Sequence, residues 1–147
     1  MRITPDTTVL VRTNVRAFGP ARELLKVVQQ IGARLVVSPF IVNEVRRVLS
    51  YPRIQAMYHL SDEEIGEHLQ YIESLSDIVV PMEGPPVVLK DPNDDPIVYT
   101  ALAGQADVLC TGDKHFYEPN VLSFCSRYRI RLMSEVELLR AIRQSTV

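Results

Sequence analysis

Short apolar runs alternate with longer segments of helical periodicity along this chain, and no other feature restricts its fold as strongly. The runs at 33–38, 77–81 and 106–111 are rich in Val, Ile and Leu and lack the polar alternation of a half-exposed strand. Strands of this kind are buried on both faces, as happens when helices cover both sides of a parallel sheet. The pattern therefore predicts an α/β domain with a mostly parallel central sheet.

The ends of several predicted helices carry recognisable signals. Pro20 and Gly32 are typical of the first turn and the end of a helix, and Ser61 followed by Glu64 is the pattern of a capping box. The segment 8–11 fits either a strand or a helix. Helices are predicted at 19–32, 39–49, 61–75, 94–104 and 134–143, and strands at 2–4, 33–38, 77–81, 106–111 and 128–133.

The composition fits one globular domain spanning residues 1–147, long enough to bury a sizeable core. No run approaches the roughly 20 apolar residues of a membrane span, so we expect a soluble, cytoplasmic protein without membrane contact. The two cysteines, Cys110 and Cys125, give neither a disulfide framework nor a zinc-site spacing.

The charges are unevenly distributed along the chain. Residues 1–60 carry nine Lys or Arg against three acids, a balance of +6, whereas residues 61–147 carry seven against fifteen, a balance of −8. Most of these charges are explained as solvated faces. A basic half beside an acidic site would also suit a polyanion. The candidates for holding phosphates of such a partner are Arg12, Arg16, Arg46 and Arg47.

Four separate segments place carboxylates near the carboxyl ends of predicted strands. They are Asp6, near the first strand; Glu44, in the helix after the second; Asp91, Asp94 and Asp95, before the helix that follows the third; and Asp113, after strand 106–111. In open parallel sheets, ligands bind outside the carboxyl ends of the strands. We therefore expect these acids to meet at one edge of the sheet.

Each of these acids also has a purely structural explanation. Asp95, before a proline, is typical of a helix N-cap. Glu44 lies one turn from Arg47 and can pair with it, although its helix face otherwise leans apolar. Asp113 follows a glycine and suits a turn, and Asp6 precedes two threonines and suits a helix cap. These explanations leave open why all four gather without enough cations to neutralise them.

A carboxylate cluster without a nearby base is typical of a site for a hard divalent cation. Oxygen ligands suit Mg²⁺ and Mn²⁺. His59, His68 and His115 are scattered, and neither a GxSxG nucleophile motif nor a GxxxxGK phosphate loop occurs. The chemistry that remains is metal-assisted hydrolysis, in which the ion lowers the pKa of water and stabilises charge on a phosphate.

Four motifs, "DTTVLV", "NEVRRVL", "DPNDDPIVYTALAG" and "TGDKHF", follow one another along the chain. The ordered set resembles the PIN-domain nucleases, most closely the subgroup of toxin components of toxin–antitoxin pairs, and covers nearly the whole chain. The resemblance implies a three-layer α/β/α sandwich and a ribonuclease site that uses Mg²⁺ or Mn²⁺. It also implies an RNA substrate, an antitoxin partner and a homodimer.

The resemblance further implies roles for individual residues. The catalytic acids would be Asp6, Glu44, Asp94 and Asp113. Of these, Asp6, Asp94 and Asp113 would ligate the metal, and Glu44 would orient water. Asp95 is a possible supporting ligand, Asp91 looks peripheral, and Thr111 fits the threonine that precedes the last acid in the family.

Thr8 departs from the family pattern, because an asparagine usually stands two residues after the first acid. Threonine can donate a hydrogen bond to orient Asp6 but reaches less far, so we expect weaker metal binding or activity. The departure gives weight to an alternative function, a PIN fold retained as a binding module. A phosphatase-like domain with a nucleophilic Asp would require a second Asp where Thr8 stands.

Overall fold

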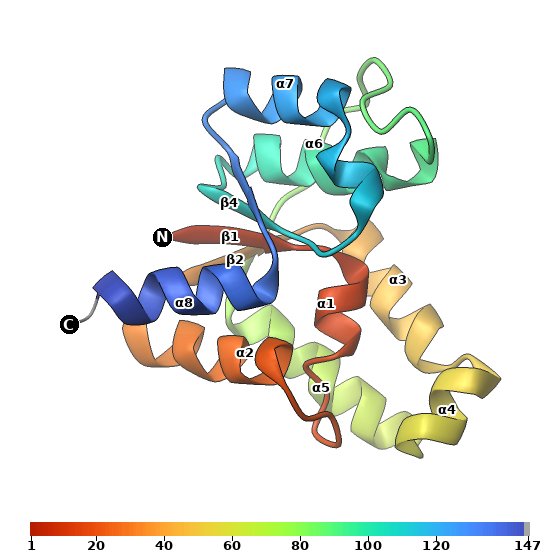
Figure 1. Cartoon of the computed structure of the whole chain (residues 1–147). Coiled ribbons are helices and arrows are strands. Elements are labelled where there is room, and N and C mark those ends of the chain that lie inside the picture. Colours follow the sequence, from red (N-terminus) through yellow and green to blue (C-terminus); the bar gives the residue numbers. More distant parts are fainter. Residues whose placement is uncertain (146–147) are drawn as a thin grey trace.

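The structure, a computed structural model, describes residues 1–145 and is built around a five-stranded sheet (Figure 1). The strand order is β3-β2-β1-β4-β5, and every neighbouring pair is parallel. The strands are β1 (Arg2–Pro5), β2 (Arg34–Val37), β3 (Ser76–Ile78), β4 (Val108–Cys110) and β5 (Arg131–Met133). The prediction of a parallel α/β sheet is confirmed.

Helices cover both faces of this sheet, so the three-layer arrangement is also confirmed. In Figure 1, α2 and α8 lie side by side on one face, and α6 and α7 lie on the other. The α-helices are α1 (Thr7–Val11), α2 (Pro20–Ile31), α3 (Pro39–Leu49), α4 (Pro52–Tyr58), α5 (Asp62–Ser74), α6 (Asp95–Ala103), α7 (Pro119–Arg127) and α8 (Glu135–Ser145). Two 3₁₀ turns, η1 (Pro92–Asp94) and η2 (Lys114–Tyr117), precede α6 and α7.

The signals at helix ends act as the sequence predicts. Gly32 ends α2 in the left-handed conformation, with φ of 68°, which a residue without a side chain adopts at little cost. At the start of α5, the Ser61 hydroxyl accepts a bond from the Glu64 N–H at 3.1 Å, and the Glu64 carboxylate accepts from the Ser61 N–H at 3.0 Å. The predicted capping box is therefore present.

Several predicted elements differ from those observed. The segment 8–11, left open between strand and helix, belongs to helix α1 because the preceding aspartate caps it. The strand predicted at 77–81 is the shorter Ser76–Ile78, and the one predicted at 128–133 is Arg131–Met133. Helices α4 and α7 were not predicted. Helix α4 has no buried residue, so its sequence carries no apolar stripe that would reveal it.

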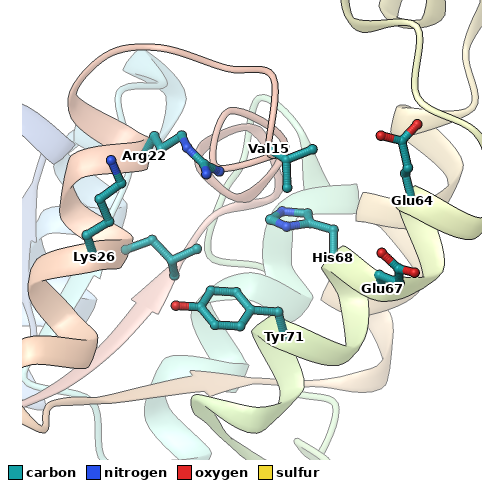
Figure 2. A pocket seen from close by; sticks show the side chains of 8 residues that line it. Val15, Arg22, Lys26, Glu64, Glu67, His68 and Tyr71 are labelled. Atoms are coloured by element: carbon teal, nitrogen blue, oxygen red, sulfur yellow. The ribbon is translucent and has the colours of Figure 1, made fainter.

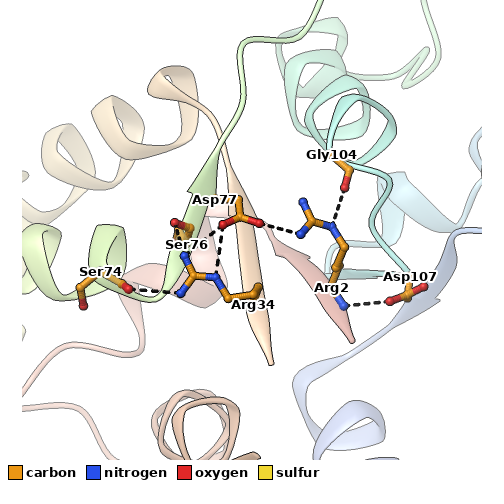
Figure 3. A network of polar contacts seen from close by, with 7 residues as sticks. All are labelled: Arg2, Arg34, Ser74, Ser76, Asp77, Gly104 and Asp107. Atoms are coloured by element: carbon orange, nitrogen blue, oxygen red, sulfur yellow. Dashed lines mark hydrogen bonds and ion pairs between the residues drawn. The ribbon is translucent and has the colours of Figure 1, made fainter. Parts of the chain in front are cut away.

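A charged network joins three neighbouring strands near their amino ends (Figure 3). Arg2 and Arg34 face each other across β1 and β2, and Asp77 of β3 accepts from both, at 2.6 and 3.0 Å. The hydrogen bonds from Arg2 and Arg34 lower the pKa of the Asp77 carboxyl. Two cations of the basic half of the sequence are thus used structurally, at the edge of the sheet opposite the predicted site.

Candidate functional site

The order of the strands creates a switch point between β1 and β4. From β1 the chain builds the sheet outward through β2 and β3, then returns to place β4 on the other side of β1. At their carboxyl ends, Pro5 pairs with Cys110, and the Asp6 N–H donates to the Cys110 carbonyl at 2.9 Å. In open parallel sheets, ligands bind in the crevice at such a point.

Asp6 lies at this switch point and is held by two hydrogen bonds. It is 4% exposed. It caps α1 by accepting from the Val9 N–H at 2.8 Å, as the sequence predicted. Its second carboxylate oxygen accepts from the Thr111 hydroxyl. Burial raises the pKa of the Asp6 carboxyl, and the bonds from Thr111 and Val9, with the charge of Arg12, partly oppose this rise.

Thr111 connects Asp6 to the acid that follows β4. Its fully buried hydroxyl donates to Asp6 and accepts from the Asp113 N–H at 3.1 Å. The Tyr117 hydroxyl in turn donates to the Thr111 carbonyl at 2.8 Å. Thr8, by contrast, is exposed, and within residues 1–145 the Asp6 carboxylate accepts hydrogen bonds only from Val9 and Thr111. The Asp6 carboxylate is therefore oriented by Thr111, the residue that follows β4, together with the Val9 N–H.

Asp94 is the point where the charges of the acids converge. It is partly buried at the junction of η1 and α6, and its side chain makes no capping bond. Burial, together with the charges of Asp91, Asp113 and Asp6, raises its pKa to about 7, and His115 opposes this only partly. A carboxylate without a structural hydrogen bond and surrounded by three others is strongly stabilised by a cation.

The predicted role of Asp95 as helix N-cap is wrong by one residue. The 3₁₀ turn that begins at Pro92 runs directly into α6, so Asp94 occupies the cap position and Asp95 lies inside the helix. The Asp95 carboxylate instead accepts from the backbone N–H groups of Val87 and Val88, at 3.1 and 2.7 Å. It fastens the preceding loop to α6.

The closest ligand atoms come partly from residues that the sequence did not favour. Asp91, Asp94 and His115 each offer one ligand atom within 4.8 Å of the others. Asp113 stands beside them, with its carboxylate 3.6 Å from the His115 imidazole. Among residues 1–145, the predicted ligands Asp6, Asp94 and Asp113 do not form such a close group. Asp91 and His115 come close to Asp94 only because η1 and η2 fold toward each other.

The donor set suits a divalent cation. The carboxylate oxygens suit Mg²⁺ or Mn²⁺, and an imidazole widens the choice to other transition metals. The Asp94 carboxylate makes no capping hydrogen bond, and its charge, together with those of the neighbouring acids, would attract such an ion strongly. The residues present therefore fit a divalent metal without fixing which one.

Glu44 stands apart from this group. Its carboxylate pairs with Arg47 of the same helix, at 2.5 and 3.1 Å, which is the structural explanation considered from the sequence. Its charge is not among those that shift the pKa of Asp6 or Asp94. The charges of Asp6 and Asp113 thus act on Asp94, whereas Glu44 has a different partner.

A cavity of about 560 Å³ lies between α2, α5 and the loop after α1 (Figure 2). Arg22 and Lys26 line one wall, and Glu64 and Glu67 line the other. The largely buried His68 also lines the cavity, with Nε2 3.1 Å from the Thr13 hydroxyl, and burial lowers its pKa. None of the acids at the switch point lines this cavity, so we assign it no part in the site.

The parallel sheet and its switch-point carboxylates define an α/β protein with a cluster of acidic residues at the carboxyl ends of its strands. Residues 2–115, more than half of the chain, match the PIN domain family, and the chain belongs to that family. No curated protein and no solved structure matches it. PIN domains are in general metal-dependent nucleases, and the matched region contains every acid of the cluster. Among residues 1–145, no helix is long and apolar enough to cross a membrane.

Proposed function

We propose that this chain is a ribonuclease that hydrolyses internal RNA phosphodiester bonds with Mg²⁺ or Mn²⁺. The observation that carries the proposal is the state of Asp94. Its carboxylate makes no capping bond, it lies among three other acids, and its pKa is raised to about 7. Such an arrangement is unfavourable unless a cation completes it, and PIN domains are metal-dependent nucleases.

Asp94, Asp6 and Asp113 are the proposed metal ligands, with Asp91 and His115 close enough to contribute. Bound there, a divalent ion would supply positive charge at the scissile phosphate and lower the pKa of water. A neighbouring residue holds one of these ligands in place. Thr111 orients Asp6 through its hydroxyl, and restraint of this kind strongly affects metal affinity.

Asp95 and Glu44 are not proposed as metal ligands but have indirect roles. Asp95 supports the site by fastening the loop that leads to Asp94. Glu44 remains a predicted water-orienting residue, and it would have to exchange its Arg47 partner for water.

The biological setting is proposed from the motif resemblance alone. We propose that the chain is the toxin component of a toxin–antitoxin pair, acts in the cytoplasm and forms a homodimer. The alternative, a PIN fold that binds without cutting, was suggested by Thr8. The hydrogen bond from Thr111 to Asp6 favours a working site, because it supplies the orientation that the exposed Thr8 does not.

The test is cleavage of an end-labelled RNA of mixed sequence in Mn²⁺, Mg²⁺ or EDTA, with the matching DNA strand in parallel. Wild type and the control Asp62→Asn, an exposed acid on α5, should cut RNA only with metal, and Asp94→Asn should not cut. Cleavage that survives Asp94→Asn, or that persists in EDTA, would contradict the proposed site. A wild type that cuts only DNA would refute the assignment of RNA.

A further inference from the structure

An ion pair links the helix after β1 to the helix after β5. Arg12 ends α1, whose first turn Asp6 caps, and Glu135 is the first residue of α8. Their side chains meet at 2.7 Å, between the Arg12 Nη2 and the Glu135 Oε1 atoms. Because β4 lies between β1 and β5, the pair reaches across the carboxyl end of β4.

The charges of this pair act on the switch point. Arg12 opposes the raised pKa of Asp6, and Glu135 adds to it. The same groups also shift the pKa of Cys110, the last residue of β4. Burial raises the pKa of its thiol, the charges of Glu135 and Asp6 raise it further, and Arg12 opposes them. The pair therefore lies beside the acids of the site, at the Asp6 end.

The two partners differ in exposure. The side chain of Glu135 is 12% exposed and that of Arg12 is 44% exposed. Within residues 1–145, the second carboxylate oxygen of Glu135 is buried without a hydrogen-bond partner, a costly arrangement for a group that serves only stability. The buried carboxylate holds one nitrogen of the guanidinium, and the remaining donors of Arg12 have no partner within residues 1–145.

Arg46 and Arg53 are exposed on the surface, and several other arginines of the basic half are occupied elsewhere. Arg16 pairs with Glu64 and donates to backbone carbonyls, Arg22 donates to backbone carbonyls, and Arg47 pairs within its own helix. Arg12 is the cation whose charge acts on Asp6. It is thus a fixed, partly exposed guanidinium next to a cluster that would repel a polyanion.

We infer that Arg12, held in orientation by Glu135, binds a phosphate of the RNA backbone at the Asp6 end of the site. The inference rests on the proposed ribonuclease function. A guanidinium has five donors in a planar fork that matches two phosphate oxygens. One nitrogen is fixed by Glu135, so the side chain loses little freedom when the remaining donors meet the phosphate.

The test compares RNA binding by variants that all carry Asp94→Asn, so that the strand is not cut. Arg12→Gln alone leaves the buried Glu135 charge unpaired and is expected to destabilise the fold. The informative variant is therefore Arg12→Gln with Glu135→Gln, which leaves the net charge unchanged and no buried charge behind. The control is Arg131→Gln. Arg131 is an exposed arginine at the amino end of β5, so it lies away from the carboxyl ends of the strands, where the site is.

Binding is measured by fluorescence anisotropy of a fluorescein-labelled single-stranded RNA of mixed sequence over a series of NaCl concentrations. Circular dichroism checks that each variant is folded. The double variant should bind about tenfold more weakly, because a charge-assisted contact is lost. The slope of log affinity against log salt should become shallower by about 0.7, the value for one phosphate contact on a single strand. Arg131→Gln should change neither quantity.

Wild-type affinity and slope in the folded double variant would overturn the inference and leave the pair a structural feature. Cleavage by the protein with Asp94 intact, in Mn²⁺, is measured in parallel to separate the two proposals. If that protein cuts and the double variant binds normally, the phosphate contact is refuted and the nuclease stands. If the protein with Asp94 intact does not cut RNA with any metal ion tested, while binding still depends on Arg12, the nuclease is refuted and the contact stands.

Discussion

Asp94→Asn should stabilise the metal-free protein at alkaline pH while abolishing the proposed nuclease activity. Asparagine has nearly the same shape as aspartate but carries no charge, so it removes the repulsion from Asp91, Asp113 and Asp6 without leaving a cavity. Most substitutions at a folded site destabilise a protein. A gain in stability would therefore show that the charge of Asp94 destabilises the metal-free protein, as expected for a ligand of a cation.

The magnitude follows from the pKa of Asp94, which rises from 3.8 to about 7 in the folded protein. A tenfold change in a proton-binding constant corresponds to about 1.4 kcal/mol, so full coupling would give about 4 kcal/mol. Because Asp94 is partly exposed and solvent screens its neighbours, we expect about 1–2 kcal/mol. Because the pKa of Asp94 is higher in the folded state than in the unfolded state, the protonated carboxyl stabilises the fold. This stabilisation is complete below pH 3.8 and is lost as the pH rises through about 7.

The assay is thermal unfolding in EDTA at pH 4 and pH 8, followed by circular dichroism. At pH 8, Asp94→Asn should have a Tm higher than wild type by about 2–8 °C, and at pH 4 the two should nearly coincide. Mn²⁺ at pH 8 should then raise the Tm of wild type more than that of Asp94→Asn. The exposed Asp62→Asn is the matched control. An Asp94→Asn protein that is less stable than wild type at pH 8 in EDTA would refute the reasoning.

Three further substitutions test the supports of the site and the fold. Thr111→Val removes the hydroxyl that orients Asp6, and calorimetric titration should show Mn²⁺ affinity about 10- to 100-fold weaker; unchanged affinity would argue against that role. Asp95→Ala frees two backbone N–H groups, so it should destabilise the protein by about 1–3 kcal/mol and speed proteolysis in loop 79–91; equal cleavage rates would count against it. Gly104→Ala drives a methyl group into the side chain of Val36, and urea unfolding should show a loss of about 1–3 kcal/mol, unless the strand shifts to make room.

The parallel sheet could be predicted because its central strands β1, β2 and β4 are mostly buried, and β2 and β4 therefore leave continuous apolar runs in the sequence. Helix α3 was predicted with its observed bounds, since Pro39 stands in its first turn and its apolar residues follow helical spacing. Helix α4 was not predicted because none of its residues is fully buried, although Ile54 and Tyr58 pack partly against the core. The strand predicted at 77–81 was too long, because apolar residues such as Val80 continue past the end of the ladder into an exposed loop.

The gathering of acids could be predicted from topology, but their pairwise contacts could not. Asp6 and Asp113 follow adjacent parallel strands, so their closeness follows from the strand order. Asp91 and His115 meet Asp94 only because two 3₁₀ turns fold toward each other, and no sequence period records that approach. The pairing of Glu44 with Arg47 was one of two interpretations that the helical spacing allowed.

The hydroxyl of Thr111 and the carboxylate of Asp6 are 105 positions apart in the chain. A polypeptide emerging from a ribosome therefore carries its first acid long before the strand that orients it has been made. Loop closure over this distance has to precede the contact, so the site belongs to the late steps of folding. We expect nascent chains that end before Thr111 to bind no Mn²⁺, which ribosome-stalled chains of increasing length would reveal. If the proposed function holds, the protein cannot cut RNA while its own message is still being translated through this region.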